Sequence, residues 1–244
     1  MKAYLAINPK NETLGVVGFL KSSLQKLGVR LVDLVEEADL IFSIGGDGTL
    51  LYNIYRYLDQ KKPFVGVNAG SVGFLCYVQT ESLEKDLLTL FNGEKTMTFG
   101  TFRVFFEGTV DLAIQDLRIE RPTHAPIRMR ITNNGQVLAK NHIGDGILIT
   151  GALGSTAYNL SAGGPIIPLS ESGVILTPIC PFGGGKKIYD SLLKPQIFPT
   201  VDVKVVSQGE SRLVLDNRGY LLPADSPVRI VQGSETFELF AKRQ

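Results

Sequence analysis

The hydrophobic positions in the first third of the chain form short apolar runs separated by stretches of helical spacing. The runs are YLAI at 4–7, DLIFSI at 39–44 and FVGV at 64–67. Between them, large apolar residues recur every three or four positions, as a helix with one buried face requires: Leu14, Val17, Leu20, Leu24 and Leu27, then Leu51, Ile54 and Leu58. Strands alternating with helices predict a parallel sheet, so we expect an α/β domain over residues 1–92.

The pattern changes around Asn92 and Gly93 to short segments rich in β-branched and aromatic residues. They are FRVFFEG at 102–108, VDLAIQDLRIER at 110–121 and PIRMRIT at 126–132, and the run 201–240 reads the same way. Asn133, Asn134 and Gly135 lie between two apolar runs and predict a hairpin turn, since Asn and Gly tolerate positive φ. Apart from a short helical stretch at 155–164, residues 93–244 therefore predict a mostly antiparallel β domain, whose C-terminal end is a candidate to pack back on the first domain.

A glycine-rich loop, GGDGT at 45–49, follows one predicted strand and opens a predicted helix. Glycines allow a backbone to approach phosphate, and free N–H groups at a helix start favour anions. A carboxylate in such a loop repels phosphate unless it binds Mg²⁺ or accepts a proton, which makes Asp47 a candidate metal ligand or general base. A tight turn in which Asp47 caps the helix is the structural alternative. The loop matches neither the P-loop nor the GxGxxG fingerprint.

Two further segments are dense in small residues. GVNAGSVGFL at 66–75 also follows an apolar strand, so we expect it beside the first loop, at the strand ends where open α/β sheets bind ligands. DGILITGALGSTAYNLSAGGPIIP at 145–168 offers the hydroxyls of Ser155, Thr156 and Ser161 and the ring of Tyr158. A purely structural loop-helix junction is the alternative for this last segment.

Composition and charge indicate which binding partners and which cellular compartment to expect. The formal net charge is +1 without runs of like charge, which predicts neither a nucleic-acid nor a membrane partner. The N-terminus turns polar too early for a signal peptide or a membrane span, and the two thiols, Cys76 and Cys180, are typical of buried or incidental groups in a reducing compartment. We therefore expect a soluble cytoplasmic protein. His124 and His142 are too few for a histidine metal cluster and are interpreted as surface or structural.

The motifs together resemble the NAD kinase family: GGDGTLL at 45–51, GVNAGSVGFL at 66–75, GSTAYNLSAGGPIIP at 154–168, LTPICP at 176–181 and a late Asp216. The GGDGT element alone is shared with diacylglycerol kinase, sphingosine kinase and phosphofructokinase families, whereas the second and third motifs are specific. The resemblance implies a two-domain enzyme that phosphorylates the 2′-hydroxyl of the adenosine ribose of NAD, using ATP or polyphosphate. It also implies Mg²⁺ carried mainly by the nucleotide, with no protein metal site, and a homodimer or homotetramer. A GGDGT-loop kinase of a lipid or other small molecule, or a non-catalytic NAD-binding protein, are the alternatives.

The resemblance also implies roles for individual residues. Asp47 would be catalytic, and phosphate would be bound by Gly45, Gly46, Gly48, Thr49 and Asn68. NAD would be contacted by Asp47, Gly48, Gln115, Asp116, Asp145, Thr156, Ala157, Tyr158, Ser161, Cys180 and Asp216. The sequence departs from the family pattern at Gln115 (usually Asn), Ala152 (usually Pro), Leu153 (usually Thr or Ser) and Asn217 (usually Gly). For Cys180, which falls beside a position that contacts the nicotinamide end, a buried thiol is the reading we favour.

Overall fold

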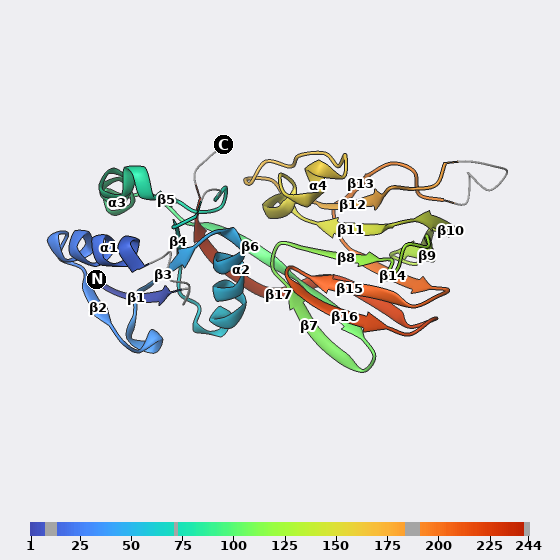
Figure 1. The fold of residues 1–244 in the computed structure, drawn as a ribbon, viewed down its shortest axis with the longest axis horizontal. Helices are drawn as coiled ribbons and strands as arrows, with labels where there is room; N and C mark the ends of the chain where they lie inside the picture. Colours follow the sequence, from blue (N-terminus) through green and yellow to red (C-terminus); the bar gives the residue numbers. More distant parts are fainter. Residues whose placement is uncertain (8–13, 71–72, 184–190, 242–244) are drawn as a thin grey trace. The chain divides into compact units, whose positions relative to one another are not determined.

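The computed structural model describes residues 1–7, 14–70, 73–183 and 191–241 and divides the chain into two compact units (Figure 1). Unit 1 comprises Met1–Phe99 and Glu235–Gln244, and unit 2 comprises Gly100–Ser234. Two long strands, β6 (Met97–Phe106) and β17 (Pro227–Phe240), run across the division, so the chain passes twice between the units.

Unit 1 contains a parallel sheet, as the alternation of strands and helices predicts. Its order is β4-β3-β1-β2, and β5 and the end of β17 both pair with β4. The strands are β1 (Lys2–Ile7), β2 (Arg30–Val32), β3 (Leu40–Gly45), β4 (Phe64–Asn68) and β5 (Val78–Gln79). Every residue of β3 and β4 is buried, which is typical of parallel strands covered on both faces.

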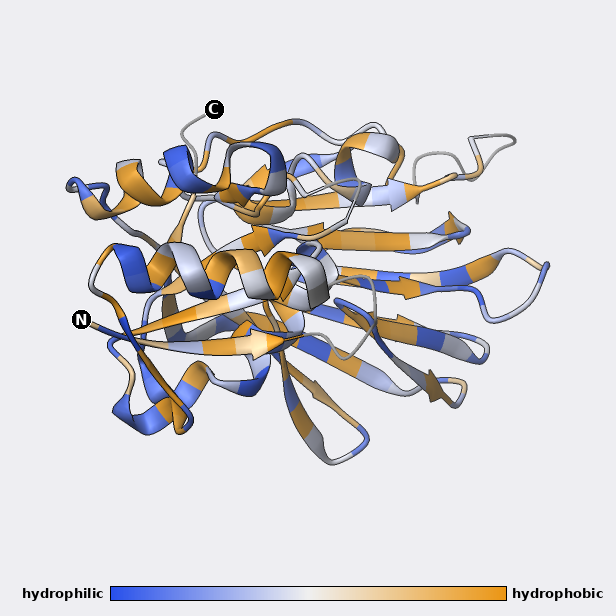
Figure 2. Cartoon of the chain, turned by 60° about the vertical axis from the view of Figure 1, so that its left-hand side comes forward, coloured by the Kyte–Doolittle hydropathy of each residue, from blue (hydrophilic) through white to orange (hydrophobic). Residues whose placement is uncertain are grey.

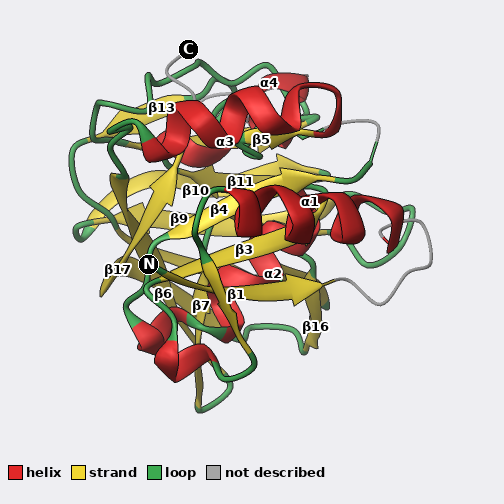
Figure 3. Cartoon of the chain, turned by 90° about the vertical axis from the view of Figure 1, so that its left-hand side faces the viewer, coloured by secondary structure: helices red, strands yellow, loops and turns green. Residues whose placement is uncertain are grey.

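The helices of unit 1 cover its sheet on both faces (Figure 3). They are α1 (Leu14–Lys26), α2 (Asp47–Arg56) and α3 (Leu83–Phe91), with single 3₁₀ turns at Val35–Glu37, Leu58–Gln60 and Thr80–Ser82. Leu20 of α1 and Leu87 of α3 share a core with Phe42 of β3. Alternate residues of a strand point to opposite faces, so the hydrogen bond from Asn53 of α2 to Ser43 of β3, 2.9 Å long, places α2 on the other face. Figure 2 shows these helices banded with polar and hydrophobic positions.

Unit 2 consists of two sheets built mainly from antiparallel strands. The first has the order β10-β9-β14-β17, with β6 pairing with β17 and β7. The second has the order β13-β12-β11-β8-β15-β16. Their remaining strands are β7 (Thr109–Ala113), β8 (Asp116–Glu120), β9 (Ile127–Asn133), β10 (Gln136–Gly144), β11 (Gly146–Thr150), β12 (Val174–Ile179), β13 (Gln196–Phe198), β14 (Asp202–Ser207), β15 (Ser211–Leu215) and β16 (Arg218–Leu222). The hairpin at Asn134 and Gly135 is confirmed, with φ of 48° and 77°.

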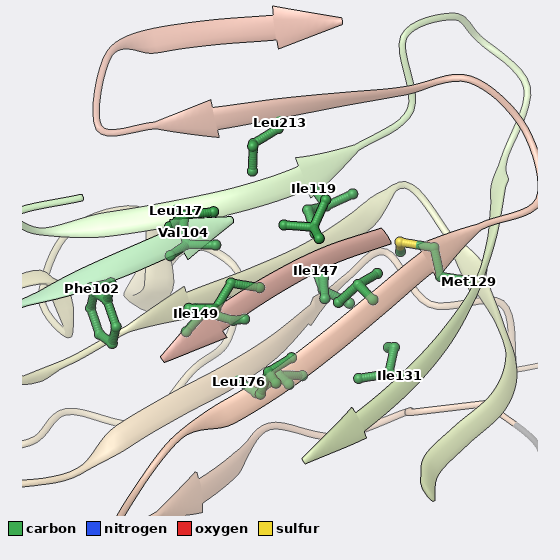
Figure 4. Packing of buried hydrophobic residues seen from close by; sticks show 14 of the residues in the cluster. Phe102, Val104, Leu117, Ile119, Met129, Ile131, Ile147, Ile149, Leu176 and Leu213 are labelled. Atoms are coloured by element: carbon green, nitrogen blue, oxygen red, sulfur yellow. The ribbon is translucent and has the colours of Figure 1, made fainter. Parts of the chain in front are cut away.

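The core of unit 2 lies between the two sheets (Figure 4). Each strand contributes alternate residues, including Phe102, Val104, Leu117, Ile119, Met129, Ile131, Ile147, Ile149, Leu176 and Leu213. The other residues of β8, Asp116, Arg118 and Glu120, therefore lie on the outer face of the second sheet. The short helix α4 (Tyr158–Ser161) and the 3₁₀ turn Ala152–Gly154 cover part of this face, because Thr177 of β12 donates to Asn159 of α4 at 2.6 Å.

Across the described parts of the chain, none of the helices combines the length and the apolar character needed to cross a lipid bilayer.

Candidate functional site

Asp47 is the first residue of α2 and binds the second glycine segment through both of its carboxylate oxygens. Oδ2 accepts the backbone N–H of Phe74 at 2.9 Å, and Oδ1 accepts that of Leu75 at 3.0 Å. The two glycine segments also meet through their strands, since Ala69 donates its N–H to the carbonyl of Gly45 at 3.1 Å. The prediction that 45–49 and 66–75 lie side by side is confirmed, although Ser71 and Val72 lie outside the described residues.

Glycine is required at two positions of these two glycine segments. A Cβ at Gly45, where φ is +157°, would lie 2.4 Å from Oγ1 of Thr49. A Cβ at Gly66 would lie 2.9 Å from both the Cα of Cys76 and a methyl group of Leu50. Gly48, by contrast, is exposed and has open space around the Cβ position. The first two glycines therefore allow close packing, whereas Gly48 leaves the start of α2 open to solvent.

Cys76 lies beside Asp47 but is poorly suited to act as a nucleophile. Burial raises the pKa of its thiol well above the usual range, and the neighbouring Asp47 carboxylate raises it further. The sulfur also lies 3.9 Å from the carbonyl oxygen of Gly45 as a weak donor. A thiol that stays protonated cannot supply the thiolate that covalent catalysis needs.

Asn68 is buried, and its side chain is occupied within the loop. Oδ1 accepts the N–H of Gly70 at 3.1 Å, and Nδ2 donates to Gln79 at 2.9 Å. Its carbonyl accepts the hydroxyl of Thr80. The phosphate contact assigned to Asn68 stays a prediction, while the contacts described here fix the path of the chain into the second glycine segment.

Phe74 is a site residue that the sequence reasoning passed over. Its side chain is 74% exposed, the largest exposure among the large hydrophobic residues that the structure describes, although its backbone N–H is bound to Asp47. An aromatic ring that is exposed to solvent offers a stacking surface for a planar ligand. The signal in the sequence was a Phe inside a glycine-rich loop rather than in a strand.

In unit 2, Asp216 positions the Gln115–Asp116 pair. Its carboxylate accepts the backbone N–H groups of Ile114 at 2.9 Å, Gln115 at 2.7 Å and Asp116 at 3.3 Å. The side chain is only 3% exposed, and Nη1 of Arg218 lies 3.8 Å from Oδ2. Asp216 therefore organises the start of β8 from the turn between β15 and β16, while its predicted contact with NAD stays a prediction.

Asp116 differs from Asp216 in the hydrogen bonding of its carboxylate. The residue is 7% exposed, and its carboxylate accepts no hydrogen bond from the described residues. Burial, then the negative charge of Asp216, raise its pKa to about 7, against a smaller opposing effect of Arg118. The pKa of Asp216 is also raised by burial, although the backbone N–H groups and Arg218 oppose that shift. Two carboxylates in one buried neighbourhood disfavour a second negative charge.

Tyr158 lies over the outer face of the second sheet. The guanidinium of Arg118 lies 5.6 Å from the centre of its ring, and Arg118 is fixed by Glu120 at 2.7 Å. Tyr158 is 40% exposed, and burial raises the pKa of its hydroxyl, against an opposing effect of the Arg118 guanidinium. Tyr158 of the third motif therefore lies against β8, the strand that begins with the predicted residue Asp116.

Asp145 and Cys180 flank this group at the other end of β8. Asp145 forms an ion pair with Arg121 at 2.9 Å, and its N–H donates to the carbonyl of Ile179. The prediction that Cys180 is buried is wrong, because it is exposed. It follows β12 directly and has a φ of +43°, a left-handed conformation that ends the strand and turns the side chain toward solvent. The apolar pattern of β12 does not extend to this residue.

The remaining residues of the third motif are arranged around a buried amide. Asn159 donates to the carbonyls of Ser155 at 3.0 Å and Pro165 at 2.8 Å and accepts from Thr177. This fixes the segment whose half-buried Thr156 and Ala157 and exposed Ser161 were predicted to contact NAD. Leu153, in place of a hydroxyl residue, is buried and offers its carbonyl to the amide of Gln115 at 3.4 Å.

The structure thus brings the predicted residues together in two groups, one in each unit. Unit 1 holds Gly45, Gly46, Asp47, Gly48, Thr49 and Asn68 around the start of α2. Unit 2 holds the others on the second sheet: Gln115, Asp116 and Asp216 at one end of β8, Asp145 and Cys180 at the other, and Thr156, Ala157, Tyr158 and Ser161 in the covering segment. His142, buried and bonded to Ser191 and Gly146, lies outside these groups, and burial lowers its pKa.

The described residues contain no cluster of three or more His, Cys, Asp or Glu side chains able to enclose a metal ion. Mg²⁺ usually takes one or two carboxylates and completes its shell with phosphate oxygens and water. Asp47 fits that limited role, because each of its oxygens accepts only one backbone N–H and retains a further lone pair.

Comparisons with known proteins agree with this arrangement. A family model described as the ATP-NAD kinase N-terminal domain matches residues 14–95, and one described as the ATP-NAD kinase C-terminal domain matches residues 118–241. The chain is 39% identical over 176 residues to an NAD kinase of Rickettsia canadensis, covering 68% of each chain. It is 40% identical over 153 residues to one of Rickettsia akari, covering 61% of this chain and 59% of the relative.

Two solved structures are similar in fold. An NAD kinase from Archaeoglobus fulgidus in complex with ATP aligns with a TM-score of 0.76 and 26% identity, covering all of this chain and 94% of the other. A yeast NADH kinase complexed with NADH aligns with a TM-score of 0.81 over 99% of this chain and 83% of the other, at 19% identity. The α/β unit followed by a mostly antiparallel β unit is therefore a known arrangement.

Proposed function

The chain belongs to the NAD kinase family, and we propose that Asp47 assists the transfer of a phosphoryl group to the 2′-hydroxyl of the adenosine ribose of NAD. The activity of this family, and of this chain, is that of an NAD kinase, a phosphotransferase. The carboxylate of Asp47 carries the proposal, because it stands at the open start of a helix and is oriented by two backbone N–H groups.

In the proposed reaction, the ribose oxygen attacks the γ-phosphorus of the donor in line with the leaving group. The new O–P bond forms as the bond to the β-phosphate oxygen breaks, and the hydroxyl proton passes to the Asp47 carboxylate. The bonds from Phe74 and Leu75 hold that carboxylate in one orientation, so its reorganisation cost during proton transfer is small. The N–H groups at the start of α2 would face the transferred phosphate.

We assign contacts with the nucleotide to two groups of residues. In unit 1, the exposed ring of Phe74 supports stacking against a planar base, and its backbone N–H is bound to Asp47. In unit 2, Gln115, Asp116 and the segment around Tyr158 supply amide, carboxyl, hydroxyl and aromatic groups on the outer face of the second sheet. The organised start of β8 supports this assignment, since Asp216 fixes Gln115 and Asp116 through their backbone.

ATP is the phosphoryl donor that we favour, because the similar Archaeoglobus fulgidus structure contains it. Mg²⁺ bound to the triphosphate would neutralise its charge, and the Asp47 carboxylate is the protein group that we assign to help place it. Polyphosphate stays a proposed alternative donor. We further propose that the protein is cytoplasmic, because both cysteines are free and an exposed thiol such as Cys180 suits a reducing compartment. The homodimer or homotetramer that the family resemblance implies is proposed on that resemblance alone.

An assay of NADP formation tests the proposal. NAD and NADH are offered as acceptors, with sphingosine and diacylglycerol in parallel, and ATP and polyphosphate are compared as donors. We expect phosphorylation of NAD with ATP and none of the lipids. Phosphorylation of a lipid without formation of NADP would overturn the proposal, and tight NAD binding without turnover under every donor would indicate a binding protein.

A further inference from the structure

Gln79 of β5 organises the part of the second glycine segment that holds Asp47. Residues 73–77 lie outside any helix or strand, so their course depends on other contacts. Gln79 supplies two of these contacts with the hydrogens of its amide. Nε2 donates to the carbonyl of Cys76 at 2.7 Å and to the carbonyl of Gly73 at 3.3 Å. One side chain therefore ties together both ends of the stretch that binds Asp47.

The orientation of the Gln79 amide follows from a backbone donor. The N–H of Gly70 can only donate, so the atom of Asn68 that accepts it at 3.1 Å is Oδ1, and Nδ2 of Asn68 faces Gln79. Nδ2 then donates to Oε1 of Gln79 at 2.9 Å, which turns Nε2 of Gln79 toward the two carbonyls. The opposite orientation would set an acceptor against two acceptors, so the network has one direction.

The backbone of Gln79 is anchored independently of its side chain. Asp86 of α3, which is 8% exposed, accepts the N–H of Gln79 at 2.9 Å and the hydroxyl of Ser82 at 2.7 Å. Gln79 also pairs with Asn68 in the parallel strands β4 and β5. Because its backbone is fixed, the amide can serve as a support for the loop.

A single peptide group connects Gln79 to Asp47. The carbonyl of Gly73 and the N–H of Phe74 belong to the same planar unit, so the direction of one fixes the direction of the other. Gln79 holds the carbonyl, and Oδ2 of Asp47 accepts the N–H at 2.9 Å. The next N–H, that of Leu75, donates to Oδ1 at 3.0 Å. Rotation of this peptide group would break its bonds to Gln79 and Asp47 together, and each bond polarises the group for the other.

We propose that Gln79 is a positioning residue for phosphoryl transfer, which acts through the backbone of residues 73–76 to hold the Asp47 carboxylate in its reactive orientation. This inference rests on the proposed function, because Asp47 is the group on which Gln79 acts. In this role Gln79 itself touches neither substrate. Without its amide, the peptide group between Gly73 and Phe74 would rotate more freely, and Asp47 would spend less time oriented toward the ribose hydroxyl. The loss would therefore fall on the chemical step rather than on NAD binding.

Two substitutions of Gln79 test this role. Gln79→Met keeps the length of the side chain and removes its polar atoms, whereas an ionised Gln79→Glu keeps the acceptor for Asn68 and removes the donors for Gly73 and Cys76. We expect both to lower kcat for NADP formation by at least about tenfold, with the KM for NAD within about threefold of wild type. A kcat close to wild type in Gln79→Glu would overturn the inference.

Gln232→Met is the matched control. Gln232 is an exposed residue of unit 2 whose Nε2 donates to the carbonyl of Thr101 at 3.2 Å. The control removes a hydrogen bond of the same kind away from the glycine segments, so we expect a kcat within about twofold of wild type. A loss as large as that of Gln79→Met would overturn the assignment to Gln79.

A double-mutant cycle separates positioning from a general structural role. If Gln79 acts through Asp47, adding Gln79→Met to Asp47→Asn should change kcat by less than about threefold, because the group to be positioned is already gone. A purely structural role would make the two losses multiply. A further fall of about tenfold in the double variant would therefore contradict positioning through Asp47.

Hydrogen exchange measured by NMR tests the link without turnover. In the wild-type protein, both protons of the Gln79 side-chain amide should exchange slowly, and rapid exchange would contradict the network without any substitution. In the Gln79 variants, the amides of Phe74 and Leu75 should exchange faster while those of β3 keep their protection. The protection of β3 also reports that a variant is folded, and Gln79→Glu, which keeps the bond to Asn68, carries the kinetic test if Gln79→Met is not.

Failure of the proposed function gives a different pattern. If Asp47→Asn turns over like the wild-type protein, the proposed role of Asp47 fails and the role of Gln79 falls with it. If Asp47→Asn is impaired while Gln79→Glu is not, only the inference about Gln79 is disproved.

Discussion

The backbone N–H of Gln115 donates to the carboxylate of Asp216 at 2.7 Å, although 101 residues separate the two along the chain. Asp216 has a φ of +52°, in the left-handed region that Asp and Asn tolerate best among residues with a side chain. The tight turn between β15 and β16 therefore presents a carboxylate to the start of β8. This geometry explains why a residue far along the chain determines the conformation of the Gln115–Asp116 pair.

The first prediction concerns the stability of Asp116→Asn as a function of pH. The folded-state pKa of Asp116 is raised from 3.8 to about 7, so the folded protein binds more protons than the unfolded chain between these values. Stability is therefore lost as pH rises through this window. Asp116→Asn removes that loss, and its stability relative to wild type should increase by roughly 2–3 kcal/mol between pH 5 and pH 8.

Urea unfolding of the two proteins at pH 5, 6, 7 and 8 measures this difference. Asp202→Asn serves as a control, because the pKa of Asp202 is lowered by its hydrogen bond with Arg229 and it stays ionised over this range. A constant stability difference between Asp116→Asn and wild type across the four pH values would show that Asp116 does not titrate there.

The second prediction concerns Asn159, the amide at the centre of the covering segment. Asn159→Leu keeps the volume but leaves Thr177 and the carbonyls of Ser155 and Pro165 without their buried partner. We expect a loss of about 2–4 kcal/mol in the free energy of unfolding. Thr177→Val, which removes one bond, should cost only about 1 kcal/mol. Equal losses in the two variants would contradict the central role of Asn159.

The third prediction compares two glycines of the same loop. In Gly45→Ala the new methyl group would lie 2.4 Å from Oγ1 of Thr49, whereas at Gly48 it would meet open space. Gly45→Ala should lower the free energy of unfolding by at least about 2 kcal/mol. Gly48→Ala, in the first turn of α2, should leave it unchanged or slightly higher. Thermal unfolding of both variants checks this, and a fully stable Gly45→Ala would contradict the close packing of the loop.

The fourth prediction concerns the two thiols. Cys180 is exposed, whereas Cys76 is buried and its thiol pKa is raised by burial and by Asp47. A thiol-specific chromogenic reagent should therefore label one cysteine in the native protein and two after denaturation. Cys180→Ser should abolish the native reaction. Rapid labelling of Cys76 in the native protein would contradict its burial beside Asp47.

The sequence predicted the layout of unit 1 well because strand and helix differ in the spacing of their apolar residues. The runs at 39–44 and 64–67 became β3 and β4, and the GGDGT loop lies at the start of α2 as expected. In unit 2, the hairpin at Asn134 followed from local conformational preference alone. Local signals of this kind are readable from a single sequence.

Long-range contacts could not be read in the same way. Nothing near Phe74 indicates that its N–H binds Asp47, 27 residues earlier, and nothing near Asp216 indicates its bonds to 114–116. The burial of Asp116 was missed because an acidic residue in a strand usually faces solvent. The exposure of Cys180 was missed because β12 ends at Ile179 and Cys180 itself has a positive φ, so the buried pattern of the strand stops one residue earlier.

Asp47 also holds the second glycine segment, so substitution affects more than proton transfer. An Asn side chain can accept the N–H of Phe74 or Leu75 on its oxygen, but its amide nitrogen cannot accept the other. Turnover of Asp47→Ala, measured with and without added formate, therefore separates the two roles of Asp47. Formate supplies a carboxylate without restoring the tether, so partial recovery of turnover would assign the loss to the missing base, and no recovery would assign it to the loop.

The most direct test of the account compares NADP formation and NAD affinity in Asp47→Asn and the wild-type protein. If Asp47 assists proton transfer while unit 2 carries much of the NAD binding, turnover should fall by at least about a hundredfold, with the fold intact and the Kd for NAD within about threefold of wild type. Turnover close to the wild-type rate in Asp47→Asn would contradict the account.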